Sequence, residues 1–422
     1  MAVAGLRGTG DWSESERPTN FRESILYMEP QGDTPLTALL GKVKSAPTND
    51  PQYSWWAEPR DLIYLTLNGD FGTSDTLLTL TVNDPSAANI KQHWSSALHL
   101  IPGDVLMAEP TADAAVYNYE QMVVTAVHSS TQFSVQRAAF GTVADDLPLN
   151  GKLLKIGSAF AEGTAAPTST TRNPVKYTNF TQIWKTTYEL TNTAKATHLR
   201  TGDALTNDKK RRMTDHAKDI ELSLLFGVPS ESVGENGKPK RTTAGIRYMI
   251  PEANTTILVD NWGLAKSAVA GNNLIDAISP VFDYSSPAGD TRIALCGNAA
   301  LNNLNRAIVS SSGASGVDLS RGMAEKVYGM NFRELTFPQG RILLKTHPLL
   351  SRHPLYTNSM WILDFSALKW RPLQGRDTKG KDNIQTDDED VQRGMWLTEA
   401  GLMVDMGGQT LGYIGNLGAV VA

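Results

Sequence analysis

The sequence has almost no cysteine. Its single thiol, Cys296, lies in the apolar run 292–296, so an intrachain disulfide and a cysteine-based metal cage are both excluded. We expect Cys296 to be a buried small hydrophobe and not a reactive thiol. This composition favours a chain that is made and used in a reducing cytoplasm.

Long apolar runs are also missing. Residues 1–11 lack the apolar core of a signal peptide, and no stretch of about 18 uninterrupted apolar residues occurs anywhere. The tail from residue 401 to residue 422 is partly apolar, but Asp405, Gln409 and Asn416 interrupt it. We therefore expect buried strands and turns in the tail, and no membrane partner.

Enzyme motifs are absent as well. The chain has no Gly-x-Ser-x-Gly elbow, no P-loop, no His-Glu-x-x-His and no dinucleotide-binding glycine fingerprint. The pairs His93 with His99 and His347 with His353 have a spacing that suits neither one helix face nor a zinc pattern. The acidic run 387–390 lacks the alternation and the glycine of a calcium loop, which favours a solvated loop. We predict no catalysis, no metal and no cofactor.

Positive charge is not in excess. The formal net charge of -5 argues against a dedicated nucleic-acid binder, because such a protein needs surplus Lys and Arg to replace the counterions of phosphate. The densest basic cluster comprises Lys209, Lys210, Arg211 and Arg212. It falls in the opening turns of a predicted helix, where the helix macrodipole disfavours positive charge.

Four environments can offset this basic cluster: the nearby Asp203 and Asp208, acidic residues of a neighbouring subunit, DNA phosphates, or solvent alone. Solvent is the plainest of them. Among the external partners we favour the neighbouring subunit, because the chain is acidic overall and directional pairing would help to set the register between copies.

What the sequence does contain is material for burial. Apolar residues make up 41% of the chain, which suffices for a core, and 422 residues exceed what one core usually serves. Residues 1–50 form a predicted arm without a core of its own, to be ordered by lying on the rest of the chain or on a neighbour. Within it, Asp33 or Thr34 can cap a short helix that starts at Pro35 and stops at Gly41.

A β-rich stretch, residues 51–190, follows the arm. Short runs of strand-forming residues separated by turn residues predict a small all-β unit within residues 60–157. The predicted strands are residues 77–82, 104–108, 121–127, 132–136 and 153–156. Residues 174–185 alternate again, as expected of a strand returning to the segment that begins at Tyr53, which makes the β unit an insertion in a two-stranded loop.

Residues 203–226 have the period of a helix, ended by Gly227 and Pro229. One apolar stripe at i, i+4, i+7 and i+11 predicts the buried face, formed by Met213, Ala217, Ile220 and Leu224. This helix dominates residues 191–240. Residues 241–335 alternate strands and helices as a compact α/β unit, with a helix around 274–282 and a glycine- and serine-rich loop at 310–316. In residues 336–422 the predicted strands are residues 341–345, 359–365 and 394–397.

Several segments resemble one family of phage head proteins. Residues 35–43 followed by 48–56 look like the start of the family typified by phage SU-ten, and residues 157–163, 177–183 and 396–402 are also similar to its segments. The order of arm, extended loop, long helix, α/β unit and returning strands resembles the Hong Kong 97-type fold of tailed-phage and herpesvirus major capsid proteins.

The resemblance implies an α+β fold with named parts. They are an N-terminal arm (1–50), an extended loop (51–190) with an inserted β-domain (60–157), a peripheral domain with the spine helix (191–240), an axial domain (241–335) and return strands (336–422). The implied function is that of a major capsid protein, which self-assembles into the hexamers and pentamers of an icosahedral head around double-stranded DNA. The implied location is the virion, after assembly in the cytoplasm of a bacterial host.

The partners implied are further copies of the chain, a portal, decoration proteins and DNA bound without sequence specificity. A separate scaffolding protein is also implied, because only residues 1–50 precede the extended loop.

Two other classes of protein stay open at this point. One is a trimeric phage or surface adhesin whose β insert binds glycan, for which Trp55 and Trp56 would form a platform, although a core role at a domain junction suits them better. The other is a hydrolase without a recognisable motif.

Overall fold

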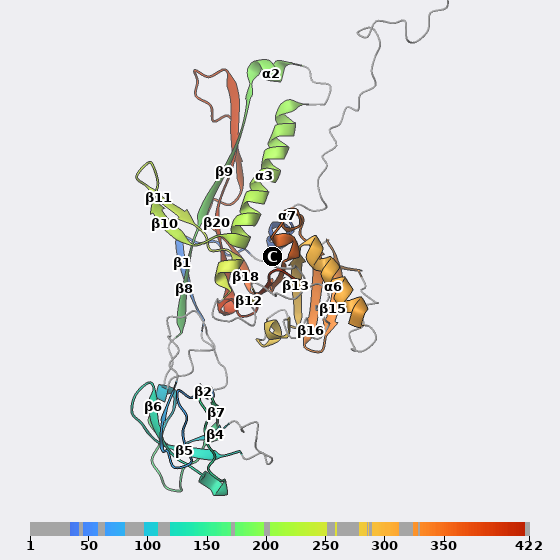
Figure 1. The fold of residues 1–422 in the computed structure, drawn as a ribbon. Coiled ribbons are helices and arrows are strands. Elements are labelled where there is room, and N and C mark those ends of the chain that lie inside the picture. The colour runs from blue at the N-terminus through green and yellow to red at the C-terminus, as the bar shows by residue number, and fades with distance from the viewer. Residues whose placement is uncertain are drawn as a thin grey trace, which may run out of the picture.

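The computed structural model of the chain describes residues 34–41, 45–57, 64–80, 97–108, 119–169, 174–197, 203–250, 258–259, 278–284, 286, 289–311, 324–327 and 330–417. Most of the expected arm, the first part of the helix expected around 274–282 and the loop at 312–316 lie outside these residues. Figure 1 shows a small β unit at one end, a long helix beside long strands, and a mixed unit of helices and strands next to them.

The small β unit is one six-stranded antiparallel sheet in the order β2-β7-β4-β5-β6-β3. Its strands are β2 (Tyr64–Thr66), β3 (Leu77–Thr79), β4 (Asp104–Ala108), β5 (Gln121–Val127), β6 (Gln132–Gln136) and β7 (Lys152–Ser158), with short 3-10 helices at Ala97–His99 (η2) and Ala139–Gly141 (η3). The predicted bounds of β4, β5 and β6 are confirmed. Alternation places Phe133 and Val135 of β6 in a hydrophobic cluster of the sheet's own.

A two-stranded ribbon links this sheet to the rest of the chain. Strand β1 (Gln52–Ala57) pairs antiparallel with β8 (Val175–Phe180), so that Gln52 lies opposite Phe180 and Ala57 opposite Val175. The expected return of the chain to the segment around Tyr53 is therefore confirmed. Figure 1 shows the six-stranded sheet at the far end of this ribbon, away from the other elements.

The long helix α3 (Ala204–Phe226) lies along a pair of long strands, β9 (Gln182–Thr191) and β20 (Val391–Val404). Its start is fixed by Asp203, whose carboxylate accepts a hydrogen bond from the Thr206 amide, and its end by Gly227. The predicted helix is confirmed. Strands β18 (Leu368–Pro372) and β19 (Lys379–Lys381) pair with β20, α2 (Asn192–Ala196) follows β9, and β10 (Ser230–Val233) pairs with β11 (Pro239–Thr242) after the helix.

Strand β20 is much longer than the expected run 394–397, because its glycines are packing sites and not strand breaks. A Cβ on Gly394 would lie 2.3 Å from the Tyr188 hydroxyl, and one on Gly401 would lie 2.4 Å from the Tyr53 hydroxyl. Each glycine therefore lets an aromatic side chain of another strand cross β20.

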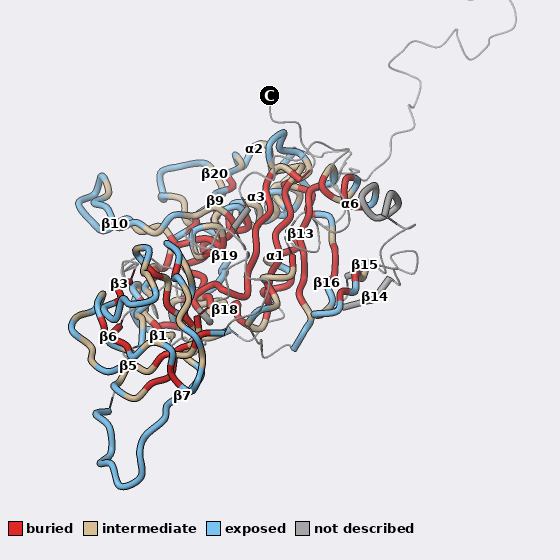
Figure 2. Tube along the Cα trace, turned by 60° about the horizontal axis from the view of Figure 1, so that its bottom comes forward, coloured by how far each residue is buried: buried red, intermediate tan, exposed pale blue. Residues whose placement is uncertain are grey.

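The mixed unit is built on a seven-stranded sheet in the order β12-β21-β17-β13-β16-β15-β14. The strands are β12 (Leu258–Val259), β13 (Thr291–Cys296), β14 (Ala324–Val327), β15 (Met330–Phe337), β16 (Gly340–Thr346), β17 (Met360–Leu363) and β21 (Gly412–Ile414). The helical elements are α1 (Pro35–Leu40), α4 (Ile246–Met249), α6 (Asn298–Ser311), α7 (Pro348–Arg352), η4 (Ser279–Phe282), η5 (Tyr356–Asn358) and η6 (Asp405–Gly408). Figure 2 shows buried residues running through this sheet.

One hydrophobic core joins the mixed unit to α3 and α1. It includes Trp361 of β17, Leu224 of α3 and Leu36 of α1, all fully buried, together with Cys296, which is 1% exposed. Burial raises the pKa of the Cys296 thiol, so this side chain behaves as the small hydrophobe that the sequence predicts.

The predicted apolar stripe of α3 is only partly buried. Ile220 and Leu224 are buried, Ala217 is half-buried, and the prediction for Met213 is wrong because this side chain is 48% exposed. Met213, Ala217 and Ile220 line a cavity of about 330 Å³ between α3, α1 and Trp370. The remaining buried positions of the helix hold Leu225 and the polar His216 and Glu221. An apolar stripe does not anticipate the two polar residues.

This difference along one stripe gives a matched pair of variants. Ile220→Ala should lower the free energy of unfolding of the subunit by about 2–3 kcal/mol, because it removes buried methyl groups and leaves a cavity. Met213→Ala should lower it by less than about 1 kcal/mol, because much of that side chain already contacts solvent. Urea unfolding of the unassembled subunit measures both, and equal losses would contradict this packing of α3.

Candidate functional site

A buried carboxylate joins three segments that lie far apart in the sequence. Glu221 of α3 is fully buried, and its Oε1 accepts hydrogen bonds from the Leu36 amide and from His347 Nε2, each at 2.8 Å. Its Oε2 accepts a hydrogen bond from the Thr37 amide at 2.7 Å. Glu221 therefore fastens the first turn of α1 and the start of α7 to the long helix.

The bonds of His347 fix its tautomer. Its Nδ1 accepts a hydrogen bond from the Leu350 amide at 3.4 Å and caps α7, so the ring proton is on Nε2, which donates to Glu221. In the sequence, His347 is notable only for its spacing from His353, which does not suit a zinc site.

A second buried histidine joins α3 to the long strands. His216 Nδ1 is 2.9 Å from the Thr186 hydroxyl of β9, and its Nε2 is 2.8 Å from the Thr398 hydroxyl of β20. Burial holds the pKa of His216 below its ordinary value, which favours the neutral ring at neutral pH. Through this one side chain, α3 is hydrogen-bonded to both β9 and β20.

The basic cluster at the start of α3 is partly neutralised by the chain itself. Lys209 Nζ lies 2.9 Å from both carboxylate oxygens of Asp382, and the Tyr188 hydroxyl donates to the same carboxylate. Lys209 also lies over the rings of Tyr188 and Trp396, 5.9 Å and 5.7 Å from their centroids. The hydrogen bond to Asp382 holds the pKa of Lys209 above its ordinary value. Lys209 thus ties the helix to the segment between β19 and β20.

The two arginines of the cluster have looser partners within α3. Arg211 lies 3.5 Å from Asp208 and Arg212 lies 3.6 Å from Asp215, and both side chains are more than half exposed. Exposed pairs of this kind contribute roughly 0–1 kcal/mol, so both guanidinium groups keep donors for other partners. Lys210 is exposed. Asp203, expected as a possible counter-charge, caps the helix instead.

A basic groove that the sequence did not predict lies between β9 and the β10–β11 hairpin. Its volume is about 590 Å³, and the cationic residues that line it are Lys185, Lys238, Lys240 and Arg241. The one carboxylate in the lining, Glu399, is bonded by Arg376. Arg241 lies 3.3 Å from Glu231, yet its Nε is buried without a hydrogen-bond partner. The turn residues Asn236 and Gly237 were the one available sign of the hairpin.

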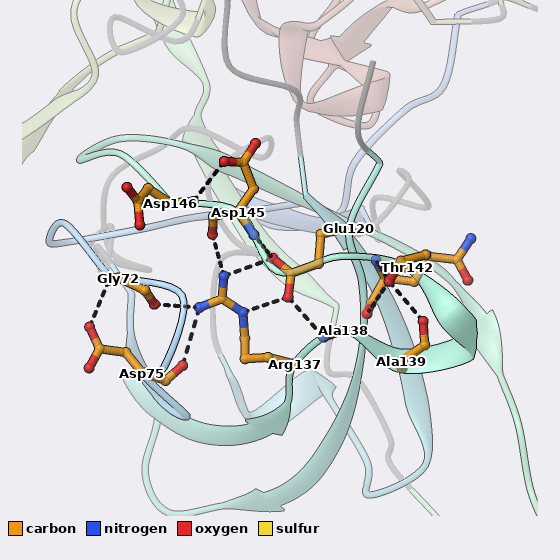
Figure 3. Close-up of polar contacts among 10 residues, drawn as sticks. Gly72, Asp75, Glu120, Arg137, Ala138, Ala139, Thr142, Asp145 and Asp146 are labelled. Carbon is orange, nitrogen blue, oxygen red and sulfur yellow. Dashed lines mark hydrogen bonds and ion pairs between the residues drawn. The ribbon is translucent and has the colours of Figure 1, made fainter. Parts of the chain in front are cut away.

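The six-stranded sheet is held by a buried ion pair that Figure 3 shows in detail. Arg137 is 5% exposed and Glu120 fully buried, and two nitrogens of Arg137 each lie 2.7 Å from an oxygen of Glu120. Arg137 also donates to the carbonyls of Gly72 and Asp75. Burial alone would raise the pKa of Glu120, but the hydrogen bonds from Arg137 and from two backbone amides lower it below its ordinary value.

No cluster of metal-binding groups occurs in the part of the chain that the structure describes. Within those residues, no group of three or more His, Cys, Asp or Glu side chains could hold a metal ion. The acidic residues 387–390 are all exposed. No described helix has the length and apolar character needed to cross a membrane. Three exposed features could take part in contacts with other molecules: the basic residues at the start of α3, the basic groove and the separate six-stranded sheet.

Comparisons with known proteins identify the family of the chain. A model of the family described as SU10 major capsid protein matches residues 8–417. The major capsid protein of Pseudomonas phage PaMx41 is 26% identical over 367 residues, which cover 85% of this chain and 80% of that protein.

Solved structures that resemble the chain also come from capsids. A chain from the capsid of the native GTA particle has a TM-score of 0.46 at 10% identity, with 98% of this chain and 99% of that chain covered. A chain from the capsid of Myoviridae phage XM1 has a TM-score of 0.44 at 10% identity, with 94% and 96% covered.

The resemblance to this family noted in the sequence is confirmed, and the described residues combine helices and sheets as the expected α+β fold requires. No finding supports the adhesin. Because the family match extends over nearly the whole chain, this protein belongs to the SU10 major capsid protein family and is a structural protein of a bacteriophage capsid.

Proposed function

We propose that copies of this chain close into the hexamers and pentamers of an icosahedral head that encloses double-stranded DNA. The observation that carries the proposal is the separation of two hydrophobic cores by the β1–β8 ribbon. A subunit extended in this way offers several surfaces to neighbours that differ from one another, and such heterologous contacts close into rings.

The parts of the subunit divide the work in this proposal. Residues 1–50 and the extended loop 51–190 reach neighbouring copies, and residues 60–157 form the inserted β-domain. Residues 191–240 form the peripheral domain around α3, residues 241–335 the axial domain, and residues 336–422 return strands to both. The sheet orders support this division, because β17 and β21 of the last segment pair within the sheet of the axial domain while β20 pairs with β9.

The further partners in this proposal follow from the family. Assembly takes place in the cytoplasm of the bacterial host, around a separate scaffolding protein and from a portal, and decoration proteins bind to the outside of the shell. The packaged DNA is contacted without sequence specificity, and the chain carries out no catalysis. A net charge of -5 supports local rather than general contact with the genome.

Sedimentation velocity of the purified full-length protein tests closure into a shell. We expect a subunit or capsomer species in equilibrium with a much faster shell species as the concentration rises. A single discrete trimer at all concentrations would contradict the proposal and would be the result expected of an adhesin.

For the exposed part of the basic cluster we propose the neighbouring subunit as partner. Arg211 and Arg212 keep free donors beside their loose intrahelical pairs, and directional ion pairs between copies would set their register. An experiment distinguishes this partner from the two alternatives, which are the packaged DNA and solvent alone.

The double variant Arg211→Ala with Arg212→Ala should reduce the yield of shells several-fold, because it removes two charges from the proposed contact. Raised salt should produce the same defect in the parent protein, since exposed charge pairs are screened. Shell yield and encapsidated DNA are both measured. Normal shells with less DNA would assign the cluster to the genome, and normal shells with normal DNA would leave it solvated.

A further inference from the structure

The two ends of the β9–β20 pair carry opposite charge. At one end, Val391 lies opposite Thr191, and the acidic residues 387–390 immediately precede Val391. At the other end, Ala400 lies opposite Gln182, and the basic groove opens beside Gln182 and Lys185. Figure 1 shows the β10–β11 hairpin beside the lower part of these strands and α2 at their upper end.

Two carboxylates of the acidic loop stand out because no ion pair in the described part of the subunit engages them. Asp387 and Asp388 are exposed and form no ion pair with any residue that the structure describes. The neighbouring acids are engaged, because Glu389 lies 3.3 Å from Arg393 and Asp390 accepts a hydrogen bond from Asn192. The nearby Lys195 donates to Gln392. The loop therefore presents two unpaired carboxylates, and the two acidic residues that follow them are held by Arg393 and Asn192.

The groove has a surplus of positive charge. Lys185, Lys238 and Lys240 are exposed, and none of them forms an ion pair with a described residue. Arg241 pairs with Glu231, and its Nε is buried without a hydrogen-bond partner. The start of α3 is a poorer match for the acidic loop, since Lys209, Arg211 and Arg212 already have carboxylates within the subunit.

The loop and the groove of one subunit cannot meet. Strand β9 runs from Gln182 to Thr191 between them, which at a rise of about 3.3 Å per residue separates them by roughly 20–30 Å. Every copy in a shell brings one acidic loop and one basic groove, so a contact between copies satisfies both in equal number. Such a contact is heterologous, the type that closes into rings.

We propose that the acidic loop of one subunit, through Asp387 and Asp388, docks in the basic groove of a second copy, which Lys185, Lys238 and Lys240 line. The proposal rests on self-assembly of the chain and adds the surfaces that join the copies. Electrostatic pairing here selects the correct neighbour and speeds its encounter.

A charge swap tests the docking. The loop variant Asp387→Lys with Asp388→Lys and the groove variant Lys238→Glu with Lys240→Glu should each lower the yield of shells by at least about tenfold, because like charges then face each other. The chain that carries all four substitutions should recover at least half of the parent's yield, since complementarity is restored with reversed sign. All four positions are exposed, so the unassembled subunits should keep the parent's melting temperature.

The matched control is Lys379→Glu with Lys381→Glu, which changes the net charge as the groove variant does, at exposed positions of β19 that lie outside both the groove and the extended loop. It should assemble like the parent. Equal loss in this control, or no recovery in the swapped chain, would overturn the docking. Groove variants that form normal shells with less DNA would also overturn it and would assign the groove to phosphate. Shell formation by the parent alone tests self-assembly separately.

Discussion

Replacing Glu221 by glutamine should lower the free energy of unfolding of the subunit by about 1–3 kcal/mol. The carboxylate accepts three hydrogen bonds in a fully buried position, from two amides of α1 and from His347. A glutamine has the same shape, but its NH₂ group would face at least one of these donors. A buried donor would then lose its acceptor, and the loss includes the full cost of its desolvation.

Urea unfolding of the unassembled subunit measures this effect. Asp219→Asn on the same helix is the matched control, because Asp219 is exposed, and it should change the free energy of unfolding by less than about 0.5 kcal/mol. An unchanged midpoint for Glu221→Gln would show that Glu221 does not hold α1 and α7 to the long helix.

The second large effect is expected in the six-stranded sheet. Glu120→Gln should lower the stability of this sheet by about 3–5 kcal/mol, because it leaves the buried guanidinium of Arg137 without a counter-charge. The sheet has a hydrophobic cluster of its own, so we expect it to unfold in a separate transition. Differential scanning calorimetry should show that transition at lower temperature while the other stays in place. A shift of both together would contradict an independent inserted domain.

Acid should affect the same sheet in the parent protein. The pKa of Glu120 lies below its ordinary value of 4.5 in the folded sheet, so the unfolded chain binds a proton first as the pH falls. The stabilisation is complete above pH 4.5 and is lost as the pH falls from there through the lowered pKa of the folded state. Glu120→Gln should abolish this acid dependence, whereas Glu162→Gln, at an exposed position, should retain it.

Local signals in the sequence predicted the elements that local chemistry determines. Asp203 and Gly227 delimit α3, and strict alternation delimits β6, because caps and alternation act within a few residues. Strand β20 was shortened because its glycines are explained only by aromatic side chains from other strands, such as Tyr188 against Gly394. The β10–β11 hairpin was missed because its residues are polar and largely exposed.

Polar groups in the core could not be predicted from periodicity. Glu221 and His216 occupy buried positions of α3 because their partners, His347 and Thr398, come from distant parts of the chain. The same limit applies to the contact surfaces. Lys185 is far in the sequence from the short basic run 238–241, and only the fold of the hairpin against β9 brings them to one groove.

Cryo-electron microscopy of the assembled full-length protein shows directly whether copies of the chain build a closed shell. We expect closed shells with pentamers at the vertices and hexamers between them, each subunit extending its six-stranded sheet on the β1–β8 ribbon toward neighbouring copies. Discrete trimers, or single subunits that stay apart at every concentration, would contradict it.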